Sequence, residues 1–549
     1  MPERALKEDV LISRFERAKA IKMLWRDLLS DAYEYALPNR NLYFSGDETD
    51  PGQIQGQKKV DRVFDSTAPN STINFANRIQ SDMMPAFQRW MKLEAGPAVP
   101  EQMRAQVNKQ LELITEQFFA VIQASNFDMS NNEALLDLAI GTAVMLVLEG
   151  TLDKPVQYIA MPAPQIYLEE GPWGSVIGVY RLHHLELRNI PLQWPDIKIT
   201  SLPDTLQQDM KDAKKAEKKV QLLESCYMET DPGTKAEKWC YDIVLMKEKK
   251  RILERNYEEN PWIVARWIKV PGEVYGRGPV IQALPDIKTI NKLRELVLKN
   301  AALHISGVYT GVDDGILNPN TVTIRPGVVI PVASNGGTRG PSLQRLEATG
   351  KFDLANIEYE KLHLAIKQVL LDNRLPPESG AVRSATEIIE RIKELARDIG
   401  SPFARLLQEY IVPIVQRTLN IMRRRGLIPA VKVNGLNVQV RVVSPLAQEQ
   451  NLNDVGTVVR WLTILQSFGP EVLHLAAKTE DVGDWMGDKL GVPAKLRRDK
   501  DEREGMQKMV AGMLAQQQAQ AQGIPTQPTN PQTIGLAAGA AGVPLRLAA

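Results

Sequence analysis

Apolar residues recur at helical spacing from residue 383 to residue 429, a stretch longer than one compact core usually needs. Charged side chains such as Arg391 and Glu394 fill the opposite face, so the pattern predicts a long helix with one buried side. Its apolar positions are Ile388, Ile389, Ile392, Leu395, Ile399, Phe403, Leu406, Leu407, Tyr410, Ile414 and Leu419.

Short motifs predict the ends of this helix and two bends within it. Ser384 and Glu387 have the spacing of a capping box, which predicts the start. Pro402 and Pro413 lie inside the pattern, and each removes a backbone donor at a cost of about 3 kcal/mol, so two bends are expected. Gly426 follows three arginines and predicts the C-terminal cap.

The N-terminal part of the chain shows the same spacing in several shorter stretches. Polar residues, Arg78 among them, interrupt the apolar face of the second stretch, and the fourth is nearly all apolar past Asp137. The predicted helices cover residues up to about 38, 65–90, 101–124 and 131–148.

The pattern changes to short β-rich runs at residues 156–186, separated by Pro and Gly turns, which predicts a small sheet. A Lys-rich stretch follows at 209–223 and predicts a helix with a solvated face. Its alternative interpretation is a surface for acidic partners. The other β expectations are a hairpin of residues 224–229 and 238–246, which brings Cys226 near Cys240, and strands around Trp262 and Trp267.

Two helical stretches of similar length, 285–306 and 352–372, enclose a segment of short β or turn runs rich in Gly and Pro. A turn-rich loop at 373–382 then leads into the long helix. After that helix, Asn434 and Gly435 predict a hairpin, and 446–509 predicts short helices. From Leu514 the composition is Gln, Ala, Gly and Pro, which predicts disorder.

Composition narrows the classes of function. The 67 basic and 66 acidic residues give a net charge of +1, which argues against tight nonspecific nucleic-acid binding but is compatible with a passage along which DNA slides. The 2 cysteines are too few for a disulfide framework. The charged N-terminus lacks a secretory signal, and the longest apolar window, 138–148, is too short to span a membrane, so a soluble intracellular protein is expected.

Catalytic and metal-binding motifs are missing from the sequence. It contains no Walker A, GxGxxG, HExxH or GxSxG pattern. His183 and His184 are adjacent on a predicted strand and would point to opposite faces, which argues against a shared metal. We therefore expect no enzyme activity, no metal site and no cofactor.

The order of these elements resembles the portal, or head-to-tail connector, proteins of short-tailed bacteriophages. The stretches that carry the resemblance are residues 25–38, 71–93, 133–150, 274–295 and 384–429. It implies a mainly α fold with β modules (α+β), assembled as a ring of about twelve copies. The implied parts are a helical and β wing (1–284), a first stem helix (285–306), a clip (307–351), a second stem helix (352–372), a channel loop (373–383), a long bent wing helix (384–426), a hairpin and helical crown (427–512) and a disordered tail (513–549).

The resemblance also implies a function at one capsid vertex of the virion, after assembly in the host cytoplasm. Double-stranded DNA would pass through the ring during packaging and ejection. The implied partners are the terminase large subunit, the major capsid and scaffolding proteins, and the tail adaptor proteins, with no membrane. By this analogy Arg374 and Arg383 flank the channel loop and are candidate DNA contacts, and the stem candidates are Lys288, Lys292, Lys299 and Lys367.

The sequence also bears on two other classes of protein. A motor or nuclease is disfavoured, because hydrolysis needs a phosphate-binding loop or clustered metal carboxylates. A helical scaffold or minor capsid protein explains the composition equally well, but not the order of helix, module, helix, loop and long helix. Each candidate arginine or lysine also has a simpler interpretation, as a salt bridge between subunits or a solvated side chain.

Overall fold

The computed structural model describes residues 6–40, 61–212, 214–230, 237–306, 308–311, 343–346, 352–372, 400–429, 436–443, 445–469, 476–477, 479–490 and 492. These residues form helices and antiparallel sheets, which confirms the α+β class. The chain divides into two units, the first comprising Met1–Val99 and Gln110–Gln450 and the second Pro100–Lys109 and Asn451–Ala549.

Two helices, α1 (Glu8–Met23) and α2 (Arg26–Ala36), replace the single helix predicted up to residue 38. The end of α1 is anchored by Lys22, which is buried and donates to the carbonyls of Ala163 and Ile166 at 2.9 and 2.7 Å. Leu24, between the two helices, is exposed and so does not continue the apolar face of α1. Tertiary hydrogen bonds therefore set the break, and no capping pattern in the sequence announces it.

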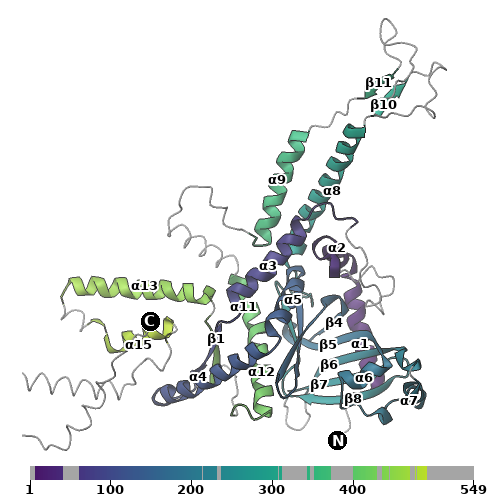
Figure 1. Cartoon of the computed structure of the whole chain (residues 1–549). Helices are drawn as coiled ribbons and strands as arrows, with labels where there is room; N and C mark the ends of the chain where they lie inside the picture. Colours follow the sequence, from purple (N-terminus) through teal and green to yellow (C-terminus); the bar gives the residue numbers. More distant parts are fainter. Residues whose placement is uncertain are drawn as a thin grey trace, which may run out of the picture. The chain divides into compact units, whose positions relative to one another are not determined.

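The largest sheet has five antiparallel strands in the order β4-β5-β6-β7-β8 (Figure 1). Helix α1 packs on it through a core of Leu11, Phe15, Ala18, Tyr167, Tyr180, Leu182, Leu223, Tyr227, Cys240 and Val244. The strands are β4 (Ile166–Glu170), β5 (Val176–Glu186), β6 (Lys219–Thr230), β7 (Glu237–Leu245) and β8 (Lys250–Tyr257).

The pairing of β6 with β7 confirms the predicted hairpin. Cys226 lies opposite Tyr241, and Cys240 lies opposite Tyr227, so the two buried thiols point to opposite faces of the sheet. The two cysteines lie at adjacent positions of the β6–β7 ladder, but their side chains are on opposite faces, so they cannot form a disulfide.

The helix predicted at 209–223 is wrong. Helix α7 (Asp204–Lys211) ends early, and β6 begins at Lys219, because Val220 and Leu222 are buried in the pairing with β5. Burial in the sheet overrides the helix preference of the lysines. Among the described residues, the other short helical segments are η1 (Pro38–Arg40), η2 (Ala163–Gln165), η3 (Pro172–Gly174), η4 (Leu187–Asn189), α6 (Ile190–Gln193), η5 (Ile199–Ser201) and η6 (Lys215–Glu217).

A second sheet has three antiparallel strands, β3 (Val156–Met161), β2 (Thr142–Glu149) and β9 (Trp262–Arg266), and α5 (Phe127–Ile140) packs against it. The helix predicted at 131–148 is therefore wrong in its second half. Gly141 separates α5 from β2 with a φ of 154°, and a Cβ there would lie 2.1 Å from the carbonyl oxygen of Gly276. An apolar run flanked in this way has no periodicity that distinguishes helix from strand.

Helix α3 (Thr67–Met83) also ends sooner than the predicted 65–90. Pro85 lacks a backbone donor and disfavours helical torsions in the residue before it, and Met84 indeed has φ −139° and ψ 60°. Strand β1 (Met91–Ala95) then pairs with β12 (Val438–Val442), and α4 (Glu101–Ala124) follows as predicted. Asn434 and Gly435 of the predicted hairpin lie outside the described residues.

Helices α8 (Pro279–Ser306) and α9 (Phe352–Val369) run antiparallel, side by side, and lead to a small strand pair, β10 (Val308–Gly311) with β11 (Leu343–Leu346) (Figure 1). Both helix predictions are confirmed, but α8 begins before the predicted residue 285. Pro285 is accommodated inside it because Val280, Ala283 and Ile287 on its first turns are buried, and that burial offsets the lost backbone hydrogen bond.

The described part of the long helix consists of α11 (Gly400–Leu406), a π-helical turn η7 (Leu407–Ile411) and α12 (Val412–Arg424). The π turn lies directly before Pro413, where the missing donor disrupts the regular ladder. Gly426 has φ 71°, and its amide and that of Leu427 donate to the carbonyls of Arg423 and Met422, which confirms the predicted cap. The capping box at Ser384 lies outside the described residues.

Helix α13 (Pro445–Ser467) carries the chain into the second unit, which also contains α15 (Thr479–Lys489). Within that unit Lys489 donates to the carboxylate of Asp454 at 2.7 Å. These two helices agree with the helical prediction for 446–509, and the Gln- and Ala-rich tail lies outside the described residues.

Candidate nucleic-acid interface

The candidate stem lysines lie on the paired helices α8 and α9. Lys288, Lys292 and Lys299 share one stripe of α8 with Glu295, since their spacing repeats every two turns. Lys288 forms an ion pair with Asp31 of α2, whereas Lys292 and Lys299 both bind Glu295, at 2.9 and 2.6 Å.

The structure thus brings Lys292 and Lys299 together around one carboxylate. Hydrogen bonds from Lys299 and Lys292 lower the pKa of Glu295, so its carboxylate is charged at neutral pH. Two lysines and one glutamate carry one net positive formal charge on an exposed face of α8, where such ion pairs stabilise a helix little. Lys367 lies apart on α9 and forms no ion pair with a described residue.

Arg374 and Arg383 lie outside the described residues, but the point where the chain leaves α9 toward them is well defined. Asp372 is buried and accepts hydrogen bonds from Ser71 Oγ at 2.8 Å and Asn74 Nδ2 at 3.0 Å, both on α3. Arg78, one turn further along α3, donates to the carbonyl of Leu371 at 2.7 Å. We call these five residues the α3 clasp.

The backbone inside the clasp is strained. The amides of Leu371 and Asp372 donate to the carbonyls of Gln368 and Lys367, the paired bonds of a Schellman motif. This motif needs a left-handed residue, normally glycine, yet the position is held by Leu371 with φ 57°. The clasp bonds and the burial of the Leu371 side chain compensate for the strain.

A second polar network fixes the base of the helix pair. Asn291 of α8 accepts from the amides of Phe64 and Asp65, at 2.7 and 3.2 Å. From α9, Tyr359 donates to Asp65 at 2.6 Å, and the His363 ring bonds the hydroxyl of Thr67 at 2.8 Å. The segment before α3 is therefore held between both helices.

The electrostatics of this network favour a neutral imidazole. Burial lowers the pKa of His363, and the neighbouring Lys367 ammonium lowers it further. Burial and the bond to Asp65 raise the pKa of Tyr359, so its hydroxyl stays protonated as a donor. The network keeps its hydrogen bonds without changing protonation near pH 7.

Sequence reasoning missed these two anchors. Arg78 was visible only as a polar interruption of an apolar face, and its partner, a backbone carbonyl, has no sequence signature. Asp372 directly precedes the predicted loop, where an Asp is expected for turn formation alone. Asn291 and Asp65 are 226 residues apart, so nothing local relates them.

Among the described residues, no group of His, Cys, Asp and Glu side chains is arranged to hold a metal ion. In the same part of the chain, none of the helices combines the length and apolar character needed to cross a membrane. The chemistry of this region is accordingly that of a polar, mildly basic helix pair with an anchored base.

Three relatives of this chain, all from bacteriophages, are named as portal proteins or a probable portal protein. The chain is 23% identical over 507 residues to the probable portal protein of Bordetella phage BPP-1, covering 89% of this chain and 88% of that protein. It is 20% identical over 562 residues to the portal protein of Escherichia phage T7, covering 98% of both. The portal protein of Salmonella phage epsilon15 matches at 22% over 526 residues, covering 88% of this chain and 90% of that protein.

One solved structure, a chain from the virion of a native gene transfer agent particle, matches with a TM-score of 0.33 and 10% identity over 80% of this chain and 95% of that chain, which is too weak to bear on the fold. The family described as bacteriophage head to tail connecting protein matches residues 8–497, nearly all of the chain. With its α+β fold and its helix pair enclosing a small β module, this chain belongs to the bacteriophage head-to-tail connecting protein family.

Proposed function

We propose that this chain is a portal subunit, about twelve copies of which form a ring at one capsid vertex through which double-stranded DNA enters and leaves. The observation that carries the proposal is the family match over residues 8–497, and relatives named portal proteins align along most of their length. The portal is a passage, so the chain needs no catalytic group of its own.

The described elements suggest how a passage could be built. In this proposal α8 and α9 are the stem, and their antiparallel pairing places the β10–β11 pair at the far end, in the clip. A ring repeats each side chain at one height, so even a single net charge from Lys292, Glu295 and Lys299 becomes a belt of positive charge. Such a belt attracts phosphates of any sequence while the internal ion pairs limit its strength, which suits sliding better than gripping.

The remaining parts and partners follow the same assignment. The wing would comprise residues 1–284 with the long helix 384–426 crossing it, and the clip, 307–351, would meet the terminase large subunit during packaging and tail adaptor proteins afterwards. The loop at 373–383 would face DNA, and the crown, 427–512, would lie inside a capsid built with scaffolding and major capsid proteins. This places the protein in the virion, at the junction of head and tail.

Negative-stain electron microscopy of the purified chain tests the proposal directly. We expect rings with a central hole and about twelvefold symmetry. The alternative, a scaffold or minor capsid protein, would give particles without a hole. A compact single-copy particle at every protein and salt concentration would refute the portal assignment.

A further inference from the structure

Three tryptophans, Trp173, Trp239 and Trp262, line a groove of about 670 Å³ beside the turn between β4 and β5. We call it the tryptophan groove. Trp173 is fully exposed and has φ 61°, a left-handed conformation that is unusual for a bulky residue. The volume lies within the normal range of ligand-binding pockets, and tryptophan is the side chain that most often anchors a bound partner.

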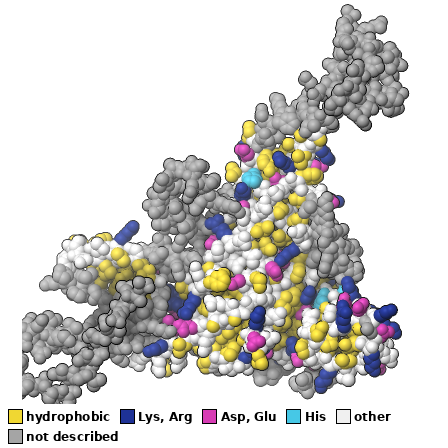
Figure 2. Space-filling view, viewed as in Figure 1, with side chains coloured by type: hydrophobic (Ala, Val, Ile, Leu, Met, Phe, Trp, Pro, Cys, Tyr) yellow, Lys and Arg dark blue, Asp and Glu magenta, His cyan; other side chains and the backbone are white. Residues whose placement is uncertain are grey.

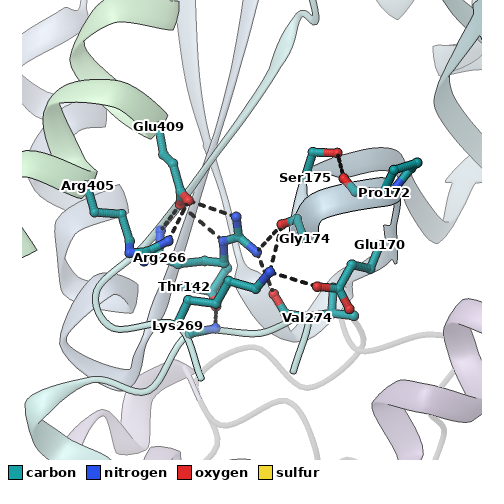
Figure 3. Close-up of polar contacts among 11 residues, drawn as sticks. Thr142, Glu170, Pro172, Gly174, Ser175, Arg266, Lys269, Val274, Arg405 and Glu409 are labelled. Atoms are coloured by element: carbon teal, nitrogen blue, oxygen red, sulfur yellow. Dashed lines mark hydrogen bonds and ion pairs between the residues drawn. The ribbon is translucent and has the colours of Figure 1, made fainter. Parts of the chain in front are cut away.

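The turn that carries Trp173 is held in place by two cations (Figure 3). Lys269 donates to the carbonyl of Gly174 at 2.9 Å, and Arg266 donates to the same carbonyl at 3.2 Å. Both cations are fixed in turn by carboxylates, each at 2.7 Å. The exposed indole is therefore positioned before any ligand arrives, which lowers the entropic cost of binding.

The described surface mixes charges of both signs, as the dark blue and magenta side chains in Figure 2 show. The lining of the groove does the same, with Arg266, Lys269 and Arg405 beside Glu258, Glu259 and Glu409. Arg266 and Arg405 both bind Glu409, at 2.7 and 3.0 Å. Lys269 and Glu258 each pair with a residue outside the groove, at 2.7 Å. Burial raises the pKa of the remaining carboxylate, so an uncharged ligand suits this lining better than a nucleic acid or a charged peptide.

The groove also contains a hydrogen-bond donor that the described residues leave unused. Trp262 is 1% exposed and begins β9, which is an edge strand of its sheet. Its indole nitrogen has no acceptor among the described residues. A buried donor without an acceptor costs about 1–3 kcal/mol, so a ligand that brings a carbonyl group to this nitrogen gains that free energy.

The chain itself carries a segment of matching chemistry. Residues 525–531 read Pro-Thr-Gln-Pro-Thr-Asn-Pro, with proline at every third position and no charged side chain. This spacing equals the three residues per turn of a polyproline II helix, so the prolines share one face and the backbone carbonyls remain free to accept hydrogen bonds. Grooves lined by aromatic rings are the usual binding sites of such segments.

The proline-rich segment has enough chain before it to reach a groove on another subunit. Residues 493–524, which are 32 residues, separate it from Val492, the last residue that the structure describes. Such a length spans up to about 110 Å when fully extended. In a ring, many segments and grooves are also held close together, which raises their effective concentration.

From these observations we propose that residues 525–531 of one copy bind, as a polyproline II helix, in the tryptophan groove of another copy. The prolines would pack on Trp173 and Trp239, and a backbone carbonyl would accept from Trp262. The proposal rests on the proposed ring. It gives neighbouring subunits a contact through a long tail, which ties them together without fixing the distance between them.

A fluorescent peptide of residues 521–535 tests the binding to the full chain by anisotropy. Trp173→Ala removes only exposed surface, so folding should not change, and we expect the peptide to bind at least about tenfold more weakly. Leu152→Ala removes an equally exposed apolar side chain from another turn and should leave binding unchanged. A peptide with alanine at the three proline positions should not bind. Equal binding by Trp173→Ala, or by the alanine peptide, would refute the docking.

Salt dependence tests whether the ligand is recognised without charge. The peptide carries no charged side chain, so its affinity should change less than about twofold between about 50 and 300 mM salt. A steep loss of affinity with salt would mean that the charged lining binds the peptide, and would overturn the proposed mode of recognition.

Competition by the tail of the chain gives an independent measurement. If that tail occupies the groove, replacing Pro525, Pro528 and Pro531 by Ala in the full chain should free it. The labelled peptide should then bind at least about threefold more tightly. Pro544→Ala changes a tail proline outside the three-residue repeat and should have no effect. Unchanged affinity in the triple variant would mean that the tail does not occupy the groove.

Disulfide crosslinking identifies which copy supplies the segment. Both native cysteines are buried, so chains with Ser175→Cys and chains with Thr529→Cys can be mixed before ring assembly and oxidised. We expect covalent dimers in at least about fivefold greater yield than from Leu152→Cys mixed with Thr529→Cys. No preference for position 175, or crosslinks only within single chains, would overturn the proposal. Rings without crosslinks would refute this docking alone, whereas an absence of rings would refute the proposed function.

Discussion

Replacement of Asp372 by Ala should open the C-terminal end of α9. The substitution removes two charge-assisted hydrogen bonds, from Ser71 and Asn74, which together stabilise the clasp by about 2–3 kcal/mol. It also leaves the Ser71 hydroxyl, which is 0% exposed, without its acceptor. Because the left-handed Leu371 is strained by about 1 kcal/mol, the motif then relies on the Arg78 bond to the Leu371 carbonyl to offset that strain.

Hydrogen exchange followed by mass spectrometry measures this opening locally. The amides of Leu371 and Asp372 form the Schellman bonds, and a loss of about 3 kcal/mol would accelerate their exchange roughly hundredfold. Asp372→Asn keeps one carbonyl acceptor and should give a smaller acceleration. Glu358→Ala, which breaks an exposed pair with Lys361 on the same helix, should change little.

Two results would contradict this account of the clasp. One is exchange in Asp372→Ala within about threefold of the wild type, which would mean that the hydrogen bonds are worth less than the normal range. The other is an equal acceleration in Glu358→Ala, which would mean that α9 frays as a whole. In a Ser71→Ala background the effect of Asp372→Ala should shrink, since no buried donor is then left unpaired.

Burial lowers the pKa of His183 to about 3, so the unfolded chain binds a proton that the folded chain does not, and stability falls as pH drops below 6.5. Urea unfolding at pH 7 and pH 5 should show a loss of about 2 kcal/mol that His183→Leu abolishes, and an unchanged pH slope in that variant would refute it. Gly426→Ala should cost about 1 kcal/mol, because φ is 71° but nothing lies within 4 Å, whereas Gly141→Ala should cost about 3 kcal/mol or more, because its Cβ would meet a backbone oxygen. Thermal unfolding compares the two, and equal shifts would contradict the steric reasoning. Arg374→Ala or Arg383→Ala should leave rings intact but lower packaging yield in a DNA packaging assay, and unchanged packaging would count against their placement at the channel.

Regular elements with a clear period were predictable from the sequence, and elements defined by distant partners were not. The apolar stripe of α9 and the glycine cap of α12 follow from local rules, and the structure has both. The sequence does not distinguish helix from strand at residues 142–148, because a fully apolar run has the same appearance in a buried helix and a central strand. The strand at Lys219 was hidden by lysines with good helix propensity, and only its pairing with β5 explains it.

The candidate site shows the same division. The basic residues of α8 could be identified as one stripe from their spacing, but not their partners, since Asp31 lies on another helix far away in sequence. The α3 clasp could not be predicted from the sequence, because the group on Leu371 that accepts the Arg78 hydrogen bond is a backbone carbonyl, and every residue has one.

Helices α9 and α12 end with the same pair of backbone hydrogen bonds, one around a leucine and the other around a glycine. The glycine ending is self-sufficient, whereas the leucine ending depends on Arg78, Ser71 and Asn74. Related sequences should reflect this difference. Where glycine replaces Leu371, the three α3 positions should vary freely. Where the residue is bulky, the three α3 residues should be kept along with it. The direction in which the polypeptide departs from α9 would then be encoded some three hundred residues upstream of the departure itself.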